Sequence, residues 1–211
     1  MFSGLIQEMA VVNSFSGDLL ALKSQYRPKI GDSIAVNGAC LTVVGIFQGG
    51  FSLQLSTHTQ QSIALENYRP GSLVHMEPAL RASDRLDGHL VQGHVDGIGV
   101  VLGSKPVGNQ VCVQIKAPTH ILELCIPKGS IAIDGVSLTL ASIETDFFEL
   151  VIIEHTFKNT LFASYQKGRR VNIESDMLVR SIAHFLRHTK NSATRNIISS
   201  WQEMDALVMG Y

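Results

Sequence analysis

The sequence of 211 residues lacks an excess of charge of either sign. Its 17 lysines and arginines face 18 aspartates and glutamates, which gives a formal net charge of −1 at pH 7. Proteins that bind nucleic acid through their surface charge carry a basic patch or a strongly basic composition. The composition therefore argues against nucleic acid as a partner.

Cysteine is also scarce, because Cys40, Cys112 and Cys125 are the only three. Their odd number and irregular spacing fit a reducing compartment better than a disulfide framework. No apolar run approaches the ~20 residues that span a bilayer, and the start MFSGLIQEMAVV lacks the features of a signal peptide. With 45% hydrophobic residues the chain can form packed cores. We expect a soluble, cytoplasmic protein of one or two domains with no membrane contact.

What the sequence does contain is an internal repeat. The stretch IAVNGACLTV at residues 34–43 returns as IAIDGVSLTL at residues 131–140, with five of the ten positions identical. Each copy reads as two short strands joined at Asn-Gly or Asp-Gly. This pair tolerates positive φ and suits a tight hairpin. The two hairpins are therefore predicted to be the centres of two related structures.

Polar side chains recur on one face of both predicted hairpins. Because side chains alternate along a strand, Cys40 shares a face with Thr42, and Ser137 shares a face with Thr139. A buried cysteine is most often inert packing, and a strand threonine often reflects β-propensity alone. The recurrence of polar groups in both copies favours the other interpretation, in which both faces hold similar ligands.

The repeat continues beyond the hairpins at the same offset of 97 residues (134 − 37 = 97). Aligned at this offset are Phe51 with Phe148, His58 with His155, Tyr68 with Tyr165 and Glu77 with Glu174. Upstream the offset becomes 89, so FSGLIQ at the start and VQGHVD at residues 91–96 are equivalent first strands. Two copies of about 90 residues are longer than the units of a solenoid, so we predict two similar domains.

Short alternating or apolar segments bounded by turn residues predict the strands. Besides the first hairpin, they lie at residues 5–12, 51–55, 71–77, 93–102, 110–116, 130–143, 147–153 and 169–174. Residues 62–67 predict a short helical turn, residues 80–88 a linker, and the segment 13–29 gives the least clear strand. Many short strands between turn signals are typical of an antiparallel barrel or sandwich.

From residue 177 the apolar pattern changes to that of a helix. Leu178, Ile182, Phe185 and Leu186 fall on one helical face, and a second helical pattern follows at residues 197–207. Two alternatives are open for the first apolar face. It could pack on its own barrel, or it could form a contact between subunits.

Two histidines stand out in the segment GHLVQGH. His89 and His94 are five residues apart, a spacing that suits neither one strand face nor one helix face, so we expect no metal site from this pair. An isolated histidine is most often structural. Each of these follows a glycine at the first strand of a domain, and a neutral imidazole can accept a proton near pH 7. Both are therefore candidates for proton transfer.

Four motifs in order, namely MFSGLIQ, VNGACLTV, GHLVQGHVDG and IDGVSLTL, resemble the riboflavin synthase family of duplicated lumazine-binding domains. The resemblance extends from residue 1 to near residue 190. It implies an all-β fold with a C-terminal α-helix: two similar six-stranded antiparallel Greek-key β-barrels plus the helical segment. The implied domains are residues 1–87 and 88–176, followed by residues 177–211, which would assemble a homotrimer.

The resemblance also implies the reaction. Two molecules of 6,7-dimethyl-8-ribityllumazine exchange a four-carbon unit and give riboflavin and 5-amino-6-ribitylamino-pyrimidinedione, with no metal and no organic cofactor. The site would lie between the first barrel of one subunit and the second barrel of a neighbour. Holding two identical molecules in register would supply most of the rate gain. The sequence leaves open whether a lumazine synthase shell encloses the enzyme.

Carried over position by position, the resemblance implies catalytic-site residues: Phe2, Ser33, Cys40, His89, His94, Ser137 and Asp176. It implies further substrate-binding residues: Gly4, Leu5, Ile6, Leu41, Thr42, Gln54, Leu55, Ser56, Thr57, His58, Thr59, Gly93, Val95, Lys128, Leu138, Thr139, Ile153, Glu154, His155, Thr156, Phe157 and Lys158, with Cys40, His94 and Ser137 also in contact. We assign proton transfer to His94 or His89, and activation of the acceptor molecule to Cys40 or Ser33.

Two departures from the family pattern affect single positions. Asp87 stands where the family often has glycine, and His58 and His155 stand where it usually has glutamate. The main alternative function is a non-catalytic antenna protein of the same fold, which binds lumazine or flavin. Such relatives lack the second Gly-His and other site residues, whereas this chain has His89 and His94. A duplicated barrel without a ligand is the third alternative.

Overall fold

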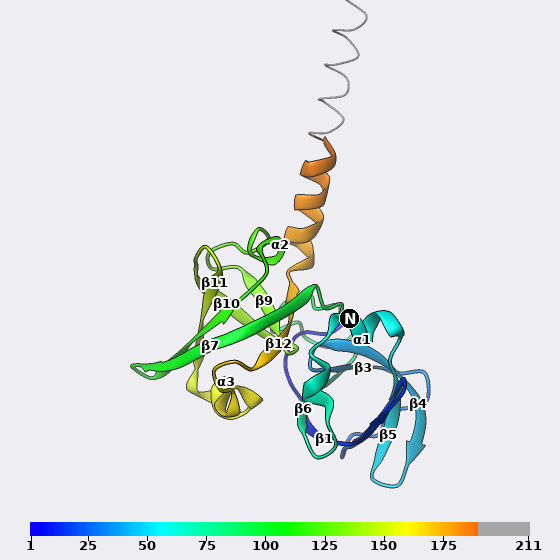
Figure 1. Cartoon of the computed structure of the whole chain (residues 1–211). Helices are drawn as coiled ribbons and strands as arrows, with labels where there is room; N and C mark the ends of the chain where they lie inside the picture. The colour runs from blue at the N-terminus through cyan, green and yellow to red at the C-terminus, as the bar shows by residue number, and fades with distance from the viewer. Residues whose placement is uncertain (190–211) are drawn as a thin grey trace, which may run out of the picture. The chain divides into compact units, whose positions relative to one another are not determined.

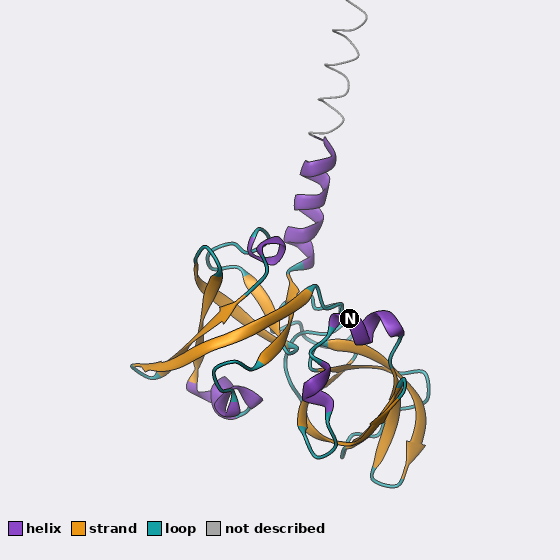
Figure 2. Cartoon of the chain, in the orientation of Figure 1, coloured by secondary structure: helices purple, strands orange, loops and turns teal. Residues whose placement is uncertain are grey.

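The computed structural model describes residues 1–189, and strands dominate its first 176 (Figure 2). The strands of the first repeat are β1 (Glu8–Ser16), β2 (Leu19–Lys23), β3 (Ser33–Val36), β4 (Ala39–Phe47), β5 (Gly50–Gln54) and β6 (Leu73–Pro78). Those of the second are β7 (Gly97–Val107), β8 (Gln110–Lys116), β9 (Ser130–Ile133), β10 (Val136–Ile143), β11 (Phe147–Ile153) and β12 (Arg170–Ser175). Short helices between them are α1 (Thr57–Ser62), η1 (Leu65–Tyr68), α2 (Thr119–Leu122), α3 (Glu154–Lys158) and η2 (Leu161–Ser164).

Each set of six strands closes on itself into an antiparallel barrel (Figure 1). The first barrel has the order β1-β2-β5-β4-β3-β6, and the second has the same order with each strand number raised by six. Neighbours such as β2 and β5 pair although two strands separate them in the sequence. The prediction of two similar six-stranded antiparallel barrels is therefore confirmed.

The repeated hairpins form as predicted. Their turns carry positive φ at Asn37 (43°), Gly38 (79°), Asp134 (45°) and Gly135 (81°), which is the backbone that Asn-Gly and Asp-Gly favour. Alternate residues of the hairpin strands are buried in the barrel interior, and the residues between them face outward. The polar positions of each hairpin therefore lie on the outside of its barrel.

Several local predictions need correction. The first strand spans Glu8–Ser16 rather than residues 5–12, and β7 spans Gly97–Val107 rather than residues 93–102. The helical turn expected at residues 62–67 is found as η1, which begins only at Leu65, and the sequence patterns missed α1, which ends at Ser62. The uncertain segment 13–29 supplies the end of β1 and the whole of β2, with a register shift between Val12 and Ser14. The sequence patterns also missed α2, α3 and η2.

Each barrel has its own hydrophobic core. The first is centred on fully buried side chains such as Leu20, Phe51 and Leu53, and the second on Phe148 and Leu150. Phe51 and Phe148 are equivalent in the repeat, as are Leu53 and Leu150. The same inward-facing pattern thus fills both interiors, which explains why the outer faces are free to carry polar groups.

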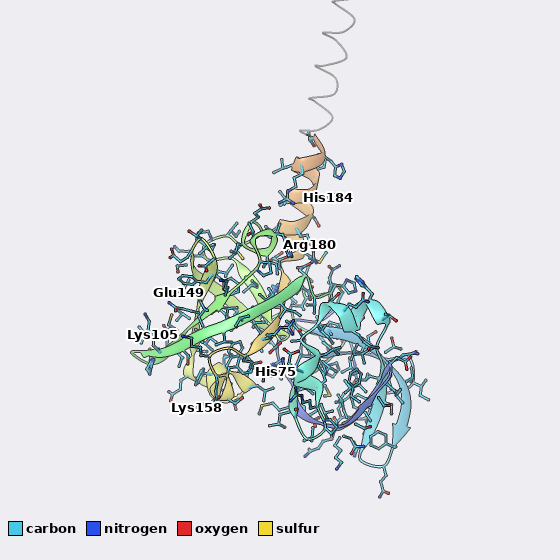
Figure 3. All side chains as sticks on the ribbon, in the orientation of Figure 1. His75, Lys105, Glu149, Lys158, Arg180 and His184 are labelled. Atoms are coloured by element: carbon cyan, nitrogen blue, oxygen red, sulfur yellow. The ribbon has the colours of Figure 1, made fainter. Side chains whose placement is uncertain are left out.

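The barrels contact each other through equivalent residues of β6 and β12. His75 (labelled in Figure 3) bonds through Nδ1 to the carbonyl oxygen of Asp134 at 2.9 Å, and its Nε2 accepts the Leu161 N–H at 2.8 Å. The equivalent Asn172 accepts the Ala64 N–H at 2.8 Å and donates to the carbonyl of the first hairpin turn. Equivalent residues of the two repeats therefore make equivalent contacts across the interface, as in an approximate two-fold arrangement.

Residues 177–189 are helical and belong to a unit separate from the two barrels. The predicted helix is confirmed over this range, and its apolar residues Leu178, Ile182, Phe185 and Leu186 are exposed. The second helical pattern, at residues 197–207, lies outside the described residues. No helix within residues 1–189 is long and apolar enough to cross a membrane.

Candidate functional site

A hollow of about 320 Å³ opens on the outer face of the β3–β4 hairpin. It is lined by residues of the first barrel and of the segment before β7: Ala39, Cys40, His58, Thr59, Ser62, Ile63, Gly93, His94 and Val95. Six of the sequence-predicted site residues thus come together here. His58 and Thr59 reach it from the start of α1, where the Ser56 side chain caps the helix by accepting the Thr59 N–H.

The floor of this hollow depends on glycine. The carbonyl oxygen of Gly93 accepts the Cys40 N–H at 2.8 Å, and a Cβ on Gly93 would lie 2.5 Å from the Cys40 Cβ. Gly93 also has φ of +80°, which other residues adopt only with strain. The motif Gly93-His94 is therefore required to bring the chain against Cys40 and to place His94 beside it.

Cys40 is half-buried, and burial raises the pKa of its thiol. A hydrogen bond with the Ser33 side chain offsets part of this shift. A cysteine whose pKa lies above the ordinary value is protonated at neutral pH, so Cys40 offers an S–H group and not a thiolate. The geometry suits a hydrogen-bond donor or a proton source better than a nucleophile.

The second barrel repeats this arrangement with the start of the chain. The carbonyl oxygen of Gly4 accepts the Ser137 N–H at 2.8 Å, and a Cβ on Gly4 would lie 2.6 Å from the Ser137 Cβ. Gly4 has φ of +79°, nearly that of Gly93. The segment before β1 therefore lies against the second barrel, as the segment before β7 lies against the first.

Ser137 is paired with a histidine. The His89 Nδ1 lies 2.7 Å from the Ser137 hydroxyl oxygen. Burial lowers the pKa of His89, and the charge of Asp176 opposes this shift. Its Nε2 is buried and has no hydrogen-bond partner among the described residues. A neutral imidazole in contact with a hydroxyl can exchange a proton with it, so the pair Ser137 and His89 is a candidate acid–base unit.

Two buried carboxylates hold these segments, and the sequence patterns assigned them no role. Glu77 on β6 accepts the N–H groups of Ser3 and Gly4 at 2.7 and 3.0 Å and the Ser3 hydroxyl at 2.7 Å. Glu174 on β12 accepts the N–H groups of Gln92, Gly93 and His94 at 2.7, 2.9 and 3.1 Å. The signal that could have revealed them was their match at the 97-residue offset, since both are charged positions in otherwise buried strands.

Other predicted residues lie apart from the first hollow. The Ser33 side chain bonds to Cys40 but lines a second hollow, of about 360 Å³, and not the first. A third of about 500 Å³, beside β4 and β5, is lined by Asp18, Thr42, Gln54, Leu55, Ser56 and Thr57. Phe2 is fully buried, forms a β-bridge with Val91, and packs between the barrels near Ala35 and Ala132. It therefore supports the crossing segments and offers no free surface.

The remaining substrate-binding residues predicted from the sequence fall into two groups. In the first group the side chains are buried in the cores, so only backbone atoms could contact a ligand; the second group lies on the second barrel. The side chains of Leu41, Leu55 and Leu138 belong to the cores. Residues Glu154–Lys158 form α3, in which Glu154 pairs with Lys158, and the Asn159 amide lies near the His155 ring. Lys128 has φ of +65° in the turn before β9. Within residues 1–189, no three His, Cys, Asp or Glu side chains are placed to hold a metal ion.

Comparison with known proteins agrees with the duplication. The sequence profile of the lumazine binding domain matches residues 3–79 and again residues 92–176. Each matched range contains one barrel, and each barrel has an outward-facing polar hairpin covered by a segment that contains glycine. The protein therefore consists of two lumazine-binding domains and belongs to a class that binds small molecules. Curated relatives narrow this class further.

Riboflavin synthase from Photobacterium phosphoreum is 34% identical over 210 residues, which cover 94% of this chain and 95% of that protein. Riboflavin synthase from Bacillus subtilis is 34% identical over 206 residues, with 94% and 96% covered. The enzyme from Mycobacterium tuberculosis is 35% identical over 198 residues, with 89% and 98% covered. The chain belongs to the riboflavin synthase family, whose members are enzymes.

Solved structures share the fold. The crystal structure of LumP complexed with riboflavin superposes with a TM-score of 0.75 at 21% identity, and covers 83% of this chain and 99% of that chain. LumP complexed with 6,7-dimethyl-8-(1′-D-ribityl) lumazine gives a TM-score of 0.71. At this identity the likeness establishes the arrangement of the barrels and leaves the activity to other evidence.

Proposed function

We propose that the protein catalyses the dismutation of two 6,7-dimethyl-8-ribityllumazine molecules. One molecule gives up a four-carbon unit and leaves as 5-amino-6-ribitylamino-pyrimidinedione, and the other gains the unit and becomes riboflavin. The observation that carries this proposal is the equivalence of the two sites. Cys40 against Gly93 and Ser137 against Gly4 have the same backbone hydrogen bond, of 2.8 Å in both cases. A reaction between two identical molecules needs two similar binding sites.

The two sites carry different side chains, Cys40 and His94 at one and Ser137 and His89 at the other, so we assign them different steps of the reaction. His94 is exposed in the first hollow and is the candidate base for removing a proton from the acidic 7-methyl group of a bound lumazine. Cys40 and Ser33 would donate hydrogen bonds to the bound heterocycle, since the thiol is protonated. The unit of Ser137 and His89 would act on the molecule held by the second barrel.

The complete site is proposed to form between subunits of a homotrimer, with the first barrel of one subunit facing the second barrel of its neighbour. The exposed apolar face of helix 177–189 is the candidate assembly surface, because exposed apolar stripes of this kind mark interaction sites. Association with a lumazine synthase shell is a further proposal that depends on this assembly.

The proposal is tested by mixing the purified protein with the lumazine and following the absorbance of riboflavin. We expect conversion by the wild type and a loss of about 10²-fold or more in His94→Ala, which removes the proposed base. His120→Ala is the matched control, because His120 is exposed on α2 and does not line the hollow. Lumazine that binds and stays unchanged would instead support an antenna protein, and absence of binding would support a barrel without a ligand.

A further inference from the structure

Glu77 and Glu174 each bind a chain segment that completes the site on the opposite barrel. Glu174 belongs to the second barrel, yet the segment it holds carries Gly93 and His94 into the hollow of the first barrel. Glu77 belongs to the first barrel, yet the segment it holds ends at Gly4, whose carbonyl binds Ser137 of the second. Each barrel thus controls the backbone that completes the site of the other.

We propose that Glu77 and Glu174 are positioning residues, each of which sets the geometry of the binding site on the opposite barrel. The ligand in this inference is taken from the proposed function. What is new is that Glu77 and Glu174 take part, and that each acts on the site of the other barrel. Neither carboxylate lines the hollow on the first barrel, so each would act through the segment it binds.

The carboxylates are well suited to this role. Both are nearly fully buried, with 2% and 3% of their surface exposed. Each accepts three hydrogen bonds from one short segment, at 2.7 to 3.1 Å. Burial raises the pKa of Glu77, whereas the hydrogen bonds from Ser3 and Gly4 lower it. Bonds of this kind to an ionised acceptor are about twice as strong as neutral ones, so they fix the segment firmly.

Glutamine is the informative replacement, because it keeps the volume but presents an NH₂ group to backbone N–H donors. In Glu174→Gln the amide keeps one acceptor oxygen, so either the bond from Gln92 or the bonds from Gly93 and His94 are lost, and the segment that lines the first hollow beside Cys40 shifts. We expect binding at that site to weaken about tenfold or more, as expected for a lost charge-assisted hydrogen bond. In Glu77→Gln the same loss should affect the Ser137 site and spare the Cys40 site.

The two sites can be told apart by chemical labelling. Cys40 lines the first hollow, so bound riboflavin should protect its thiol from iodoacetamide, as measured by peptide mass spectrometry. Cys125 serves as an internal control, since its thiol donates to the Ile121 carbonyl in the second barrel and does not line the first hollow. Glu149→Gln is the matched variant, because it changes a carboxylate on β11 that accepts hydrogen bonds from the Gln114 and Ser142 side chains rather than from a crossing segment.

The expected result is loss of Cys40 protection in Glu174→Gln and retention of it in Glu77→Gln. Turnover should fall about tenfold or more in both variants and stay unchanged in Glu149→Gln. Equal protection in the two variants would overturn the crosswise assignment. If Glu174→Gln does not fold, Glu77→Gln decides alone: reduced turnover with intact Cys40 protection supports the assignment, and unchanged turnover overturns it. A wild type that neither binds riboflavin nor turns over would count against the proposed function itself.

Discussion

Gly38 and Gly135, the second residues of the two equivalent hairpin turns, touch each other across the interface between the barrels. A Cβ on Gly38 would lie 2.7 Å from the Gly135 nitrogen, and a Cβ on Gly135 would lie 2.8 Å from the Gly38 nitrogen. Both residues have φ near +80°. The repeated Asn-Gly and Asp-Gly pairs therefore serve two needs, since they make the turns and allow the turns to meet.

Replacing either glycine should destabilise the protein strongly. In Gly38→Ala the left-handed backbone conformation and the contact with Gly135 both become unfavourable, so we expect a loss of about 2–5 kcal/mol in the free energy of unfolding. Gly71→Ala is the matched control. Gly71 also has φ of +86°, but a Cβ there would have no other atom within 4 Å, so about 1–2 kcal/mol is expected. Urea unfolding measures both, and equal losses would contradict the packing explanation.

His75 should make stability depend on pH. Its ring is buried between the barrels, and burial lowers its pKa to about 4, whereas a histidine in the unfolded chain titrates near 6.5. Between these values the unfolded chain binds a proton that the folded chain does not. Stability contributed by neutral His75 is therefore complete above about pH 6.5 and is lost as the pH falls toward 4.

Asp134 acts in the opposite direction, because burial raises its pKa to about 6. Comparison with His75→Gln separates the two groups, since both proteins keep Asp134. Between pH 7 and pH 4.5 the wild type should lose about 1–3 kcal/mol relative to His75→Gln. His120→Gln, which changes an exposed histidine, should follow the wild type. Parallel curves for the wild type and His75→Gln in urea unfolding would rule out this role.

The sequence predicted the elements whose pattern repeats or alternates. The two hairpins, and strands such as β8 and β11, follow from alternation and from the 97-residue offset. The helix α1 was missed because THTQQS contains no apolar period, so only the cap at Ser56 marks it. The start of β1 was misplaced because Leu5 and Ile6 are as apolar as strand residues, although they belong to the segment that crosses to the other barrel.

The candidate site was predictable in part for the same reason. Cys40 and His94 carry recognisable motifs, and the structure places both in one hollow. The contact between His89 and Ser137 spans 48 positions in the sequence, and no local pattern encodes it. The match of Glu77 and Glu174 at the 97-residue offset marks both positions, but it does not show which backbone N–H groups they bind. Long-range pairing of this kind becomes visible only once the chain is folded.

Ser137 and His89 should behave as one unit in catalysis. Their side chains are 2.7 Å apart, so removal of either one should leave the other without its partner. We expect Ser137→Ala and His89→Ala each to lower turnover about tenfold or more, and the double variant to be no worse than the more damaging single one. Steady-state rates of the three variants measure this. Effects that multiply in the double variant would show two independent roles.

The apolar helix face should control assembly. Ile182 is exposed on helix 177–189, and Ile182→Glu places a charge in the proposed subunit contact. We expect the wild type to have three times the 23.0 kDa mass of one chain, and the variant to shift toward one chain in light scattering at the same concentration. His184→Glu, on the same helix but away from Ile182, is the control. A wild type with the mass of one chain would contradict the trimer.

The most direct test of the whole account is the ratio of lumazine consumed to riboflavin formed, measured by chromatography of a complete reaction with the purified protein. If two equivalent sites bring two identical molecules together, two lumazines disappear for each riboflavin, and one pyrimidinedione appears with it. A ratio other than two to one, or lumazine recovered unchanged from the protein, would contradict the account.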